Sequence, residues 1–155
     1  MRSKLPVPDQ FNIRVYGIFI RDEKVLLVRE NLRGFEFTKF PGGGLEFGEG
    51  LLEGLSREIL EELGMESRIL GHFYTTDFFQ RSAFRGNEQL LSVYYRLDIP
   101  ECPEETEFPL VFHPEEQHRL EFYWVDLKKV NPEEVTFPVD KQVVEMLIRQ
   151  MELNF

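Results

Sequence analysis

Apolar residues along the first third of the chain follow the pattern of β-strands. Residues 11–21 partly alternate between apolar and polar and are rich in β-branched and aromatic side chains, which predicts a strand. Residues 25–30, VLLVRE, predict a second strand, and the polar turn before them makes the two strands a hairpin. A short extended segment is expected at residues 37–40.

After residue 50 the apolar pattern changes to the period of a helix. Leucine and isoleucine recur at spacings of three and four, at Leu52, Leu55, Ile59 and Leu63. Gly64 stands where a helix commonly ends, so we predict a helix over residues 51–63. The stretch before it, PGGGLEFGEG at residues 41–50, holds a proline and five glycines, and we expect no regular structure there.

The second half of the chain returns to strands and ends in a helix. Further strands are predicted at residues 67–79, 89–99 and 120–127, and a terminal helix at residues 139–152. Residues 100–118 are rich in proline and glutamate and predict a long loop. The expected fold class is α+β, an α/β/α sandwich with a mixed sheet, in one domain over residues 1–155 with a loose lead-in at 1–10.

Charge and composition limit the partners. The net charge is −10 and the pI is about 4.8, which disfavours a nucleic-acid polymer and favours a small ligand whose phosphates are bridged by a metal cation. A single cysteine, Cys102, fits a reducing cytoplasm. We expect no membrane partner, because no apolar run approaches the ~20 residues needed to span a bilayer. The sequence does not decide between a monomer and a homodimer.

Three glutamates share one side of the predicted helix. Glu58, Glu61 and Glu62 are spaced i, i+3 and i+4, so their carboxylates emerge together and repel one another. A solvated helix face is the usual reason for such a pattern. The alternative is a cation site, because Mg²⁺ or Mn²⁺ prefers hard oxygen ligands, and the glycines at 42–44 would let a carbonyl such as that of Gly42 approach the ion.

The residues around these glutamates decide between the two readings. The segment from 43 to 65 resembles the signature of the Nudix hydrolases at every fixed position: Gly43, Glu49, Arg57, Glu58, Ile59, Glu61, Glu62, Gly64 and Met65. FPGGGLEFGE resembles the usual lead-in to that signature, although Thr38 stands where the family often has tryptophan. YWVDL at residues 123–127 resembles a late strand of the same fold, and the likeness covers most of residues 11–152.

This resemblance implies an enzyme that hydrolyses a nucleoside diphosphate linked to another group, with attack of water on phosphorus. It implies metal binding by Glu58, Glu61 and Glu62, with Arg57 orienting a glutamate and Glu49 bracing the loop against the helix. The general base stays open.

Glu58 or Glu61 could serve as that base, and so could an acid from a later loop. The later acids are Glu115, Glu116 and Glu121, of which we favour Glu116.

The substrate is less constrained by sequence. Arg29 is a candidate phosphate contact, although an exposed strand-end arginine reads equally well. Phe137 could stack on a base and Asp140 could bond its edge, whereas the plain alternative makes Asp140 a helix N-cap and Phe137 a core residue. These residues favour a (deoxy)nucleoside triphosphate, with ADP-ribose or a nucleotide sugar as the alternative substrate. An inactive nucleotide-binding regulatory module is the alternative of another class, but it should have lost a ligand glutamate.

Overall fold

The computed structural model describes residues 5–102 and 107–153. Residues 1–4 of the predicted lead-in and 103–106 of the predicted loop lie outside the described residues. The strands are β1 Gln10–Arg21, β2 Lys24–Leu32, β3 Phe35–Lys39, β4 Gly42–Gly44, β5 Arg68–Thr75, β6 Glu88–Asp98, β7 Val111–His113 and β8 His118–Asp126. The helices are α1 Leu51–Leu63 and α2 Pro138–Leu153, with short 3-10 turns η1 Pro114–Glu116 and η2 Pro132–Glu134.

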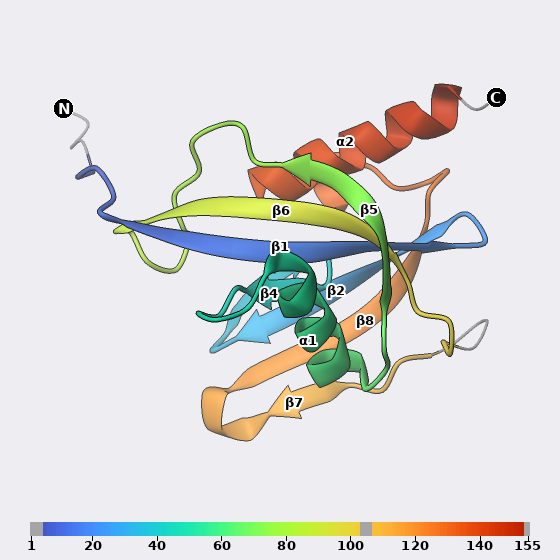
Figure 1. The fold of residues 1–155 in the computed structure, drawn as a ribbon, viewed down its shortest axis with the longest axis horizontal. Helices are drawn as coiled ribbons and strands as arrows, with labels where there is room; N and C mark the ends of the chain where they lie inside the picture. Colours follow the sequence, from blue (N-terminus) through green and yellow to red (C-terminus); the bar gives the residue numbers. More distant parts are fainter. Residues whose placement is uncertain (1–4, 103–106, 154–155) are drawn as a thin grey trace.

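The strands form one mixed sheet that splits into two arms (Figure 1). The order is β5-β6-β1-β2-β8-β7, with β3 added beside β2 and β4 beside β1. The pairing of β1 with β6 is parallel, and the other pairings are antiparallel. β1 and β2 pair only beside their turn, at Ile20↔Val25 and Arg21↔Lys24. Beyond these pairs the two strands diverge and leave space between the arms.

The two helices cover opposite faces of the sheet, which confirms the expected α/β/α sandwich with a mixed sheet (Figure 1). Successive residues of a strand point to opposite faces. Val15 and Phe19 of β1 accordingly pack in the core under α1, while Tyr16 and Ile18 pack under α2. Because both faces are covered, the middle of β1 reads as a nearly continuous apolar run.

Helix α1 has the predicted bounds, because the signals that define it are local. Leu55 and Ile59 are buried against the sheet, and each such burial contributes about 1.5–3 kcal/mol. Gly64 adopts φ of 70° and its N–H bonds to the carbonyl of Leu60, which ends the helix. Leu52 departs from the predicted stripe and is half exposed.

Two expected irregular segments contain regular structure. Gly42–Gly44 form the short strand β4, which pairs with residues 14–16 of β1, so the prediction of no regular structure at 41–50 was wrong there. The predicted loop at 100–118 includes β7 and η1. Three glycines give no alternation of side chains, so their pairing with a distant strand leaves no pattern in the sequence. No helix in the described part of the chain is long and apolar enough to cross a membrane.

Candidate active site

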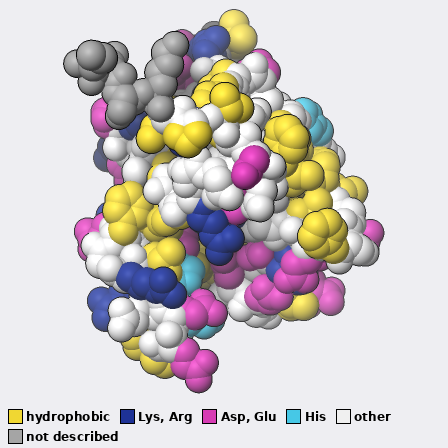
Figure 2. Space-filling model, turned by 90° about the vertical axis from the view of Figure 1, so that its left-hand side faces the viewer, with side chains coloured by type: hydrophobic (Ala, Val, Ile, Leu, Met, Phe, Trp, Pro, Cys, Tyr) yellow, Lys and Arg dark blue, Asp and Glu magenta, His cyan; other side chains and the backbone are white. Residues whose placement is uncertain are grey.

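A pocket of about 950 Å³ opens where β1 and β2 diverge. Its walls come from β1, β2, β3, β4, α1, the loop at residues 80–85, η1 and the start of α2. Figure 2 views this end of the molecule, where basic side chains lie beside acidic ones in a hollow between apolar patches. Segments that lie far apart in the sequence therefore meet in a single concave surface, which is the usual setting of a small-molecule site.

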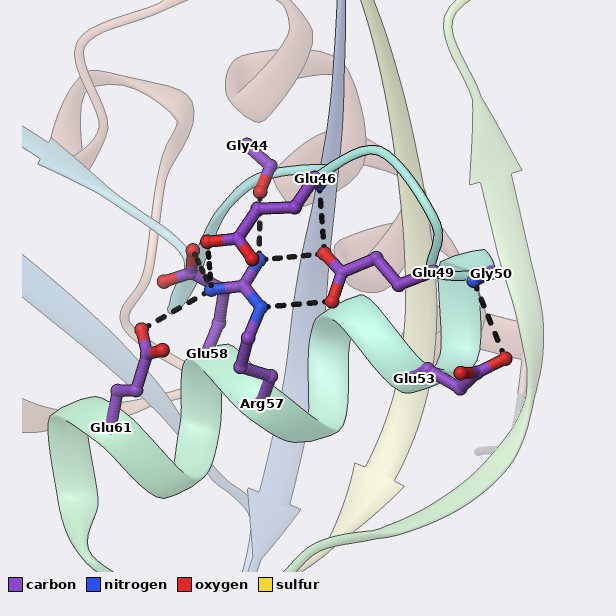
Figure 3. A network of polar contacts seen from close by, with 8 residues as sticks. All are labelled: Gly44, Glu46, Glu49, Gly50, Glu53, Arg57, Glu58 and Glu61. Carbon is purple, nitrogen blue, oxygen red and sulfur yellow. Dashed lines mark hydrogen bonds and ion pairs between the residues drawn. The ribbon is translucent and has the colours of Figure 1, made fainter.

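The guanidinium of Arg57 lies at the centre of the acidic side chains on this wall (Figure 3). It donates two hydrogen bonds to Glu49, from Nε to Oε2 at 2.9 Å and from Nη2 to Oε1 at 2.7 Å. Nη1 lies 3.0 Å from Glu58 Oε1 and 3.2 Å from Glu61 Oε2. Nη2 also donates to the carbonyl of Gly44 at 3.0 Å. Arg57 thus offsets the repulsion among the glutamates and joins α1 to the loop before it.

Glu49 belongs to that loop, and both oxygens of its carboxylate accept hydrogen bonds. Its Oε1 accepts a hydrogen bond from the backbone N–H of Glu46 at 2.8 Å as well as from Arg57. The hydrogen bonds from Arg57, with that from Glu46, lower the pKa of Glu49 to about 2. The carboxylate therefore stays ionised and holds the loop over the helix across the neutral pH range.

Two glycines let the loop and the carboxylates approach closely. A Cβ at Gly43 would come within 2.7 Å of the Glu58 carboxylate. A Cβ at Gly54 would lie 2.8 Å from Leu45 and 2.9 Å from Glu49 Oε1. Glycine at 43 therefore leaves the space that the Glu58 carboxylate occupies on the pocket wall.

Glu62 faces the pocket one turn after Glu58. Burial raises the pKa of Glu62 to about 8; nearby Lys39 opposes the rise, and the other glutamates add to it. Its Oε2 is buried and has no hydrogen-bond partner among the described residues. A buried carboxylate oxygen without a partner is costly, so this position favours a cation that the protein itself does not supply.

Near Glu62 lies a buried ion cluster formed by Glu30, Lys39 and His118. Lys39 Nζ lies 2.8 Å from Glu30 Oε2, and both side chains are almost fully buried. His118 Nε2 lies 2.6 Å from Glu30 Oε1. Burial alone would lower the pKa of Lys39, but the carboxylates of Glu30 and Glu62 raise it above its ordinary value. Lys39 therefore carries a permanent charge on the pocket floor.

The donor chemistry of this wall fits a hard divalent cation. Glu58 and Glu62 line the pocket together and offer carboxylate oxygens, the ligands that Mg²⁺ and Mn²⁺ prefer. The described residues nevertheless show no group of three acidic, histidine or cysteine side chains already gathered around one point. Glu58 and Glu61 turn toward Arg57, and the Gly42 carbonyl accepts a hydrogen bond from Lys39 at 3.0 Å. A cation would therefore compete with Arg57 and Lys39 for these oxygens.

The other predicted site residues divide between the pocket and its outside. Glu116, Phe137 and Asp140 all line the pocket. Arg29 does not: it lies 3.6 Å from the exposed carboxylate of Glu121 and stacks on the ring of Tyr123. The pocket therefore contains the favoured general base, Glu116, and both candidate nucleobase contacts, but not Arg29, the predicted phosphate contact.

Asp140 lines the pocket but does not have the N-cap role that the sequence suggested. Helix α2 begins at Pro138, so Asp140 lies inside the first turn and is not the N-cap. It is buried and accepts a hydrogen bond from the hydroxyl of Tyr94 at 2.6 Å. Burial raises the pKa of Asp140 to about 6, against the lowering effect of Tyr94.

Sequence reasoning missed Phe84, which completes an aromatic wall of Phe37, Phe84 and Phe137 in the pocket. Phe84, from the loop between β5 and β6, packs at 5.3 Å from Phe37 and 6.3 Å from Phe137, measured between ring centroids. Phe84 remains half exposed, so it offers surface to a ligand. Neither Phe84 nor the buried charge of Lys39 lies in a motif, and no spacing in the sequence connects them to the glutamates.

Thr38, which departs from the family pattern, still anchors β3 to the pocket. Its backbone N–H donates to the Thr136 hydroxyl at 2.8 Å, and its carbonyl accepts from the Thr136 N–H at 3.0 Å. These two bonds fix β3 against the segment that leads into α2. Both bonds at position 38 come from the backbone, so they do not depend on the side chain of Thr38.

Comparison with known proteins agrees with this architecture. The NUDIX domain family model matches residues 11–147, whereas no curated protein matches the sequence. The chain is similar to a NUDIX hydrolase from Nitrosomonas europaea, with a TM-score of 0.65, 22% identity, and coverage of 88% of this chain and 87% of that one.

Two further solved structures share the fold at similarly low identity. A MutT NUDIX hydrolase from Burkholderia pseudomallei matches with a TM-score of 0.66 and 18% identity, over 88% of this chain and 98% of that one. A UDP-X diphosphatase matches with a TM-score of 0.60 and 19% identity, over 96% of this chain and 66% of that one. Since the family match spans most of the sequence, the chain belongs to the NUDIX family and is a Nudix hydrolase.

Proposed function

We propose that this Nudix hydrolase cleaves a phosphoanhydride bond of a nucleoside diphosphate derivative, with a (deoxy)nucleoside triphosphate as the favoured substrate. The observation that carries the proposal is that Glu58 and Glu62 share one pocket with the aromatic wall of Phe84 and Phe137. The pocket thus offers both carboxylates for a metal–phosphate group and aromatic rings for a base.

The metal set in this proposal is Glu58 and Glu62, with Glu61 joining once it leaves Arg57. Mg²⁺ or Mn²⁺ bound there would neutralise phosphate oxygens and acidify a water molecule. The protein residues supply orientation: Arg57 holds Glu49 and Glu58 in place, and Gly43 leaves room for the Glu58 carboxylate. The hydrogen bonds of Arg57 to several carboxylates fix the direction in which their free oxygens point.

Glu116 is our choice for the residue that takes the proton of the attacking water. It lies on η1, lines the pocket and is exposed to solvent, so it can reach a water molecule inside the pocket. Glu58 and Glu61 are weaker choices, because both are already bonded to Arg57. A general base must come within hydrogen-bond distance of the water, directly or through one further water.

A nucleoside triphosphate is favoured over a nucleotide sugar because Phe137 and Asp140, the candidate contacts of a nucleobase, both line the pocket. Phe37, Phe84 and Phe137 pack against one another in tilted and edge-to-face arrangements, and the half-exposed Phe84 offers ring surface to one base. ADP-ribose or a nucleotide sugar stays the second candidate, since a volume of about 950 Å³ also accommodates a second sugar.

The test is phosphate or pyrophosphate release from a panel of nucleoside triphosphates, ADP-ribose and nucleotide sugars, with Mg²⁺, Mn²⁺ or EDTA. We expect turnover that needs the metal, and Glu62→Gln should lower kcat by roughly 100-fold or more while the variant still folds. Glu66→Gln is the matched control, because Glu66 is exposed and lies outside the pocket. Tight nucleotide binding without turnover of any substrate would instead identify a binding module.

A further inference from the structure

The pocket is strongly acidic, which is an obstacle for a phosphate-bearing ligand. Eight carboxylate side chains line it, against two arginines and one lysine. Like charges repel a polyphosphate at these distances, and Arg57, which pairs with Glu49 and Glu58, together with a bound divalent ion does not fully balance the excess. A phosphate group in the pocket therefore needs a lining cation whose N–H donors are available to it. The candidates are Arg14, Lys39 and Arg85.

Two of the three cations already lie beside protein carboxylates. Lys39 is buried beside Glu30 and also donates to the Gly42 carbonyl. Arg85 points largely to solvent and lies 3.4 Å from Glu88. Lys39 is therefore paired inside the protein, and the Arg85 side chain is mostly exposed to solvent.

Arg14, on β1, is different. Among the residues that the structure describes it forms no ion pair, and its hydrogen bond runs from Nε to the Tyr16 hydroxyl at 2.6 Å. The two Nη groups, with their fork of N–H donors, are left for another partner. Nη1 lies 3.6 Å from where a Cβ on Gly44 would stand, so it borders the glycine strand that leads to the carboxylates.

Tyr16 fixes the orientation of the Arg14 side chain. Tyr16 is buried, and its ring packs against Tyr94 at 5.2 Å between centroids. The Arg14 guanidinium lies 5.7 Å from the centre of the Tyr16 ring. A guanidinium that is held by Nε and an aromatic ring loses little entropy when its Nη groups bind a ligand.

We infer that Arg14 binds a phosphate of the substrate, beside the carboxylates that would hold the metal. This deepens the proposed function and rests on it for the identity of the ligand. The guanidinium fork matches two oxygens of a phosphate, and such charge-assisted pairs are stronger than neutral hydrogen bonds. Tyr16 is a positioning residue, since it acts on the ligand only through Arg14.

The experiment measures binding of inorganic pyrophosphate to the whole chain by calorimetry, with EDTA and again with Mg²⁺, in wild type, Arg14→Gln, Arg14→Lys and Arg96→Gln. Arg96 lies exposed on the neighbouring strand β6 outside the pocket, so Arg96→Gln matches the loss of charge alone. We expect Arg14→Gln to weaken binding by roughly 10- to 100-fold, Arg14→Lys to restore part of it, and Arg96→Gln to leave it unchanged.

A second variant tests the positioning role. Tyr16→Phe keeps the ring and removes the hydroxyl, so pyrophosphate binding should weaken by less than in Arg14→Gln, while adenosine binding stays unchanged in both variants. Equal pyrophosphate affinity of Arg14→Gln and wild type, or no pyrophosphate binding by wild type, overturns the inference. Because these measurements need no turnover, absence of hydrolysis across the nucleotide panel would refute the proposed function and leave this result standing.

Discussion

The guanidinium of Arg57 binds both oxygens of Glu49, with Nε 2.9 Å from Oε2 and Nη2 2.7 Å from Oε1. This pair joins the loop over the pocket to the helix that carries the glutamates (Figure 3). The remaining nitrogen, Nη1, approaches Glu58 and Glu61. Arg57 thus sets the position of carboxylates on two different elements at once.

Replacing Arg57 by lysine should separate charge from geometry. A lysine keeps one positive charge but cannot make the paired contact with Glu49 or reach Gly44 at the same time. We expect kcat to fall by roughly 10- to 100-fold, as for other residues that orient metal ligands. The same change at Arg149, in an exposed pair with Glu145 on α2, is the control and should leave kcat unaltered. Wild-type kcat in Arg57→Lys would show that positive charge alone is sufficient.

The second prediction concerns the space beside Glu58. In Gly43→Ala the new methyl group would come within 2.7 Å of the Glu58 carboxylate, so this side chain must leave its position on the pocket wall. We expect weaker Mn²⁺ binding and roughly 10- to 100-fold lower kcat, with the free energy of unfolding within about 1 kcal/mol of wild type because the displaced carboxylate is the flexible end of its side chain.

Gly71→Ala is the matched control for this change. A Cβ at Gly71, in β5, would meet nothing within 4 Å. Its Mn²⁺ affinity and kcat should equal those of wild type. If Gly43→Ala also binds Mn²⁺ and turns over normally, the position of Glu58 in the structure does not matter for the metal.

The glutamates and their helix were predictable because the relevant signals are local. Apolar residues at a spacing of three and four, followed by Gly64, define α1, and the same thirteen residues carry Glu58, Glu61 and Glu62. The family match confirms the reading of the surrounding signature. Gly50 before the helix, Gly64 after it and the helical period between them leave few alternatives for this segment.

The remainder of the pocket could not be predicted, because it depends on contacts between distant residues. β4 consists of glycines whose pairing with β1 leaves no periodic pattern. Lysine is normally a surface residue, so the sequence gives no sign that Lys39 is buried. Its burial depends on its ion pair with Glu30 and on the pairing of β8 with β2, the strand that carries Glu30. Arg29 and Arg14 are both strand arginines, and only the divergence of β1 from β2 places Arg14 inside and Arg29 outside.

The buried charge of Lys39 makes a strong prediction for stability. Lys39→Met removes the cation 2.8 Å from Glu30 and leaves a buried carboxylate with His118 as its remaining partner in the cluster. Loss of one partner of a buried pair costs about 3–5 kcal/mol, which urea unfolding at pH 8 would measure. The double variant Lys39→Met with Glu30→Leu should recover most of this loss, because the unpaired carboxylate of Glu30 is removed as well.

An exposed pair provides the comparison for Lys39. Lys128 lies 3.1 Å from Glu23, and both side chains are more than half exposed. Lys128→Met should change the free energy of unfolding by less than about 1 kcal/mol. Similar losses in Lys39→Met and Lys128→Met would contradict the role assigned to burial.

Asp140 makes the stability of the protein depend on pH. Burial raises the pKa of Asp140 from 3.8 to about 6 in the folded state, so the folded protein binds the proton more tightly than the unfolded chain does. The stability that this proton contributes is fully present below pH 3.8 and is lost as the pH rises through about 6. At pH 8 the folded protein therefore carries a buried, unfavourable carboxylate.

Asp140→Asn should remove this penalty and keep the hydrogen bond from the Tyr94 hydroxyl, because the asparagine carbonyl also accepts. We expect the variant to be more stable than wild type by about 1–3 kcal/mol at pH 8, with the difference shrinking toward zero at pH 4. Urea unfolding at pH 4, 6 and 8 measures this difference in stability.

Asp77→Asn is the control for Asp140→Asn. Asp77 accepts an equivalent bond of 2.6 Å from Tyr74 at the surface, and its replacement should change stability little at any pH. Lower stability of Asp140→Asn than of wild type at pH 8 would mean that Lys39 and Arg14 stabilise the ionised carboxylate by more than burial destabilises it.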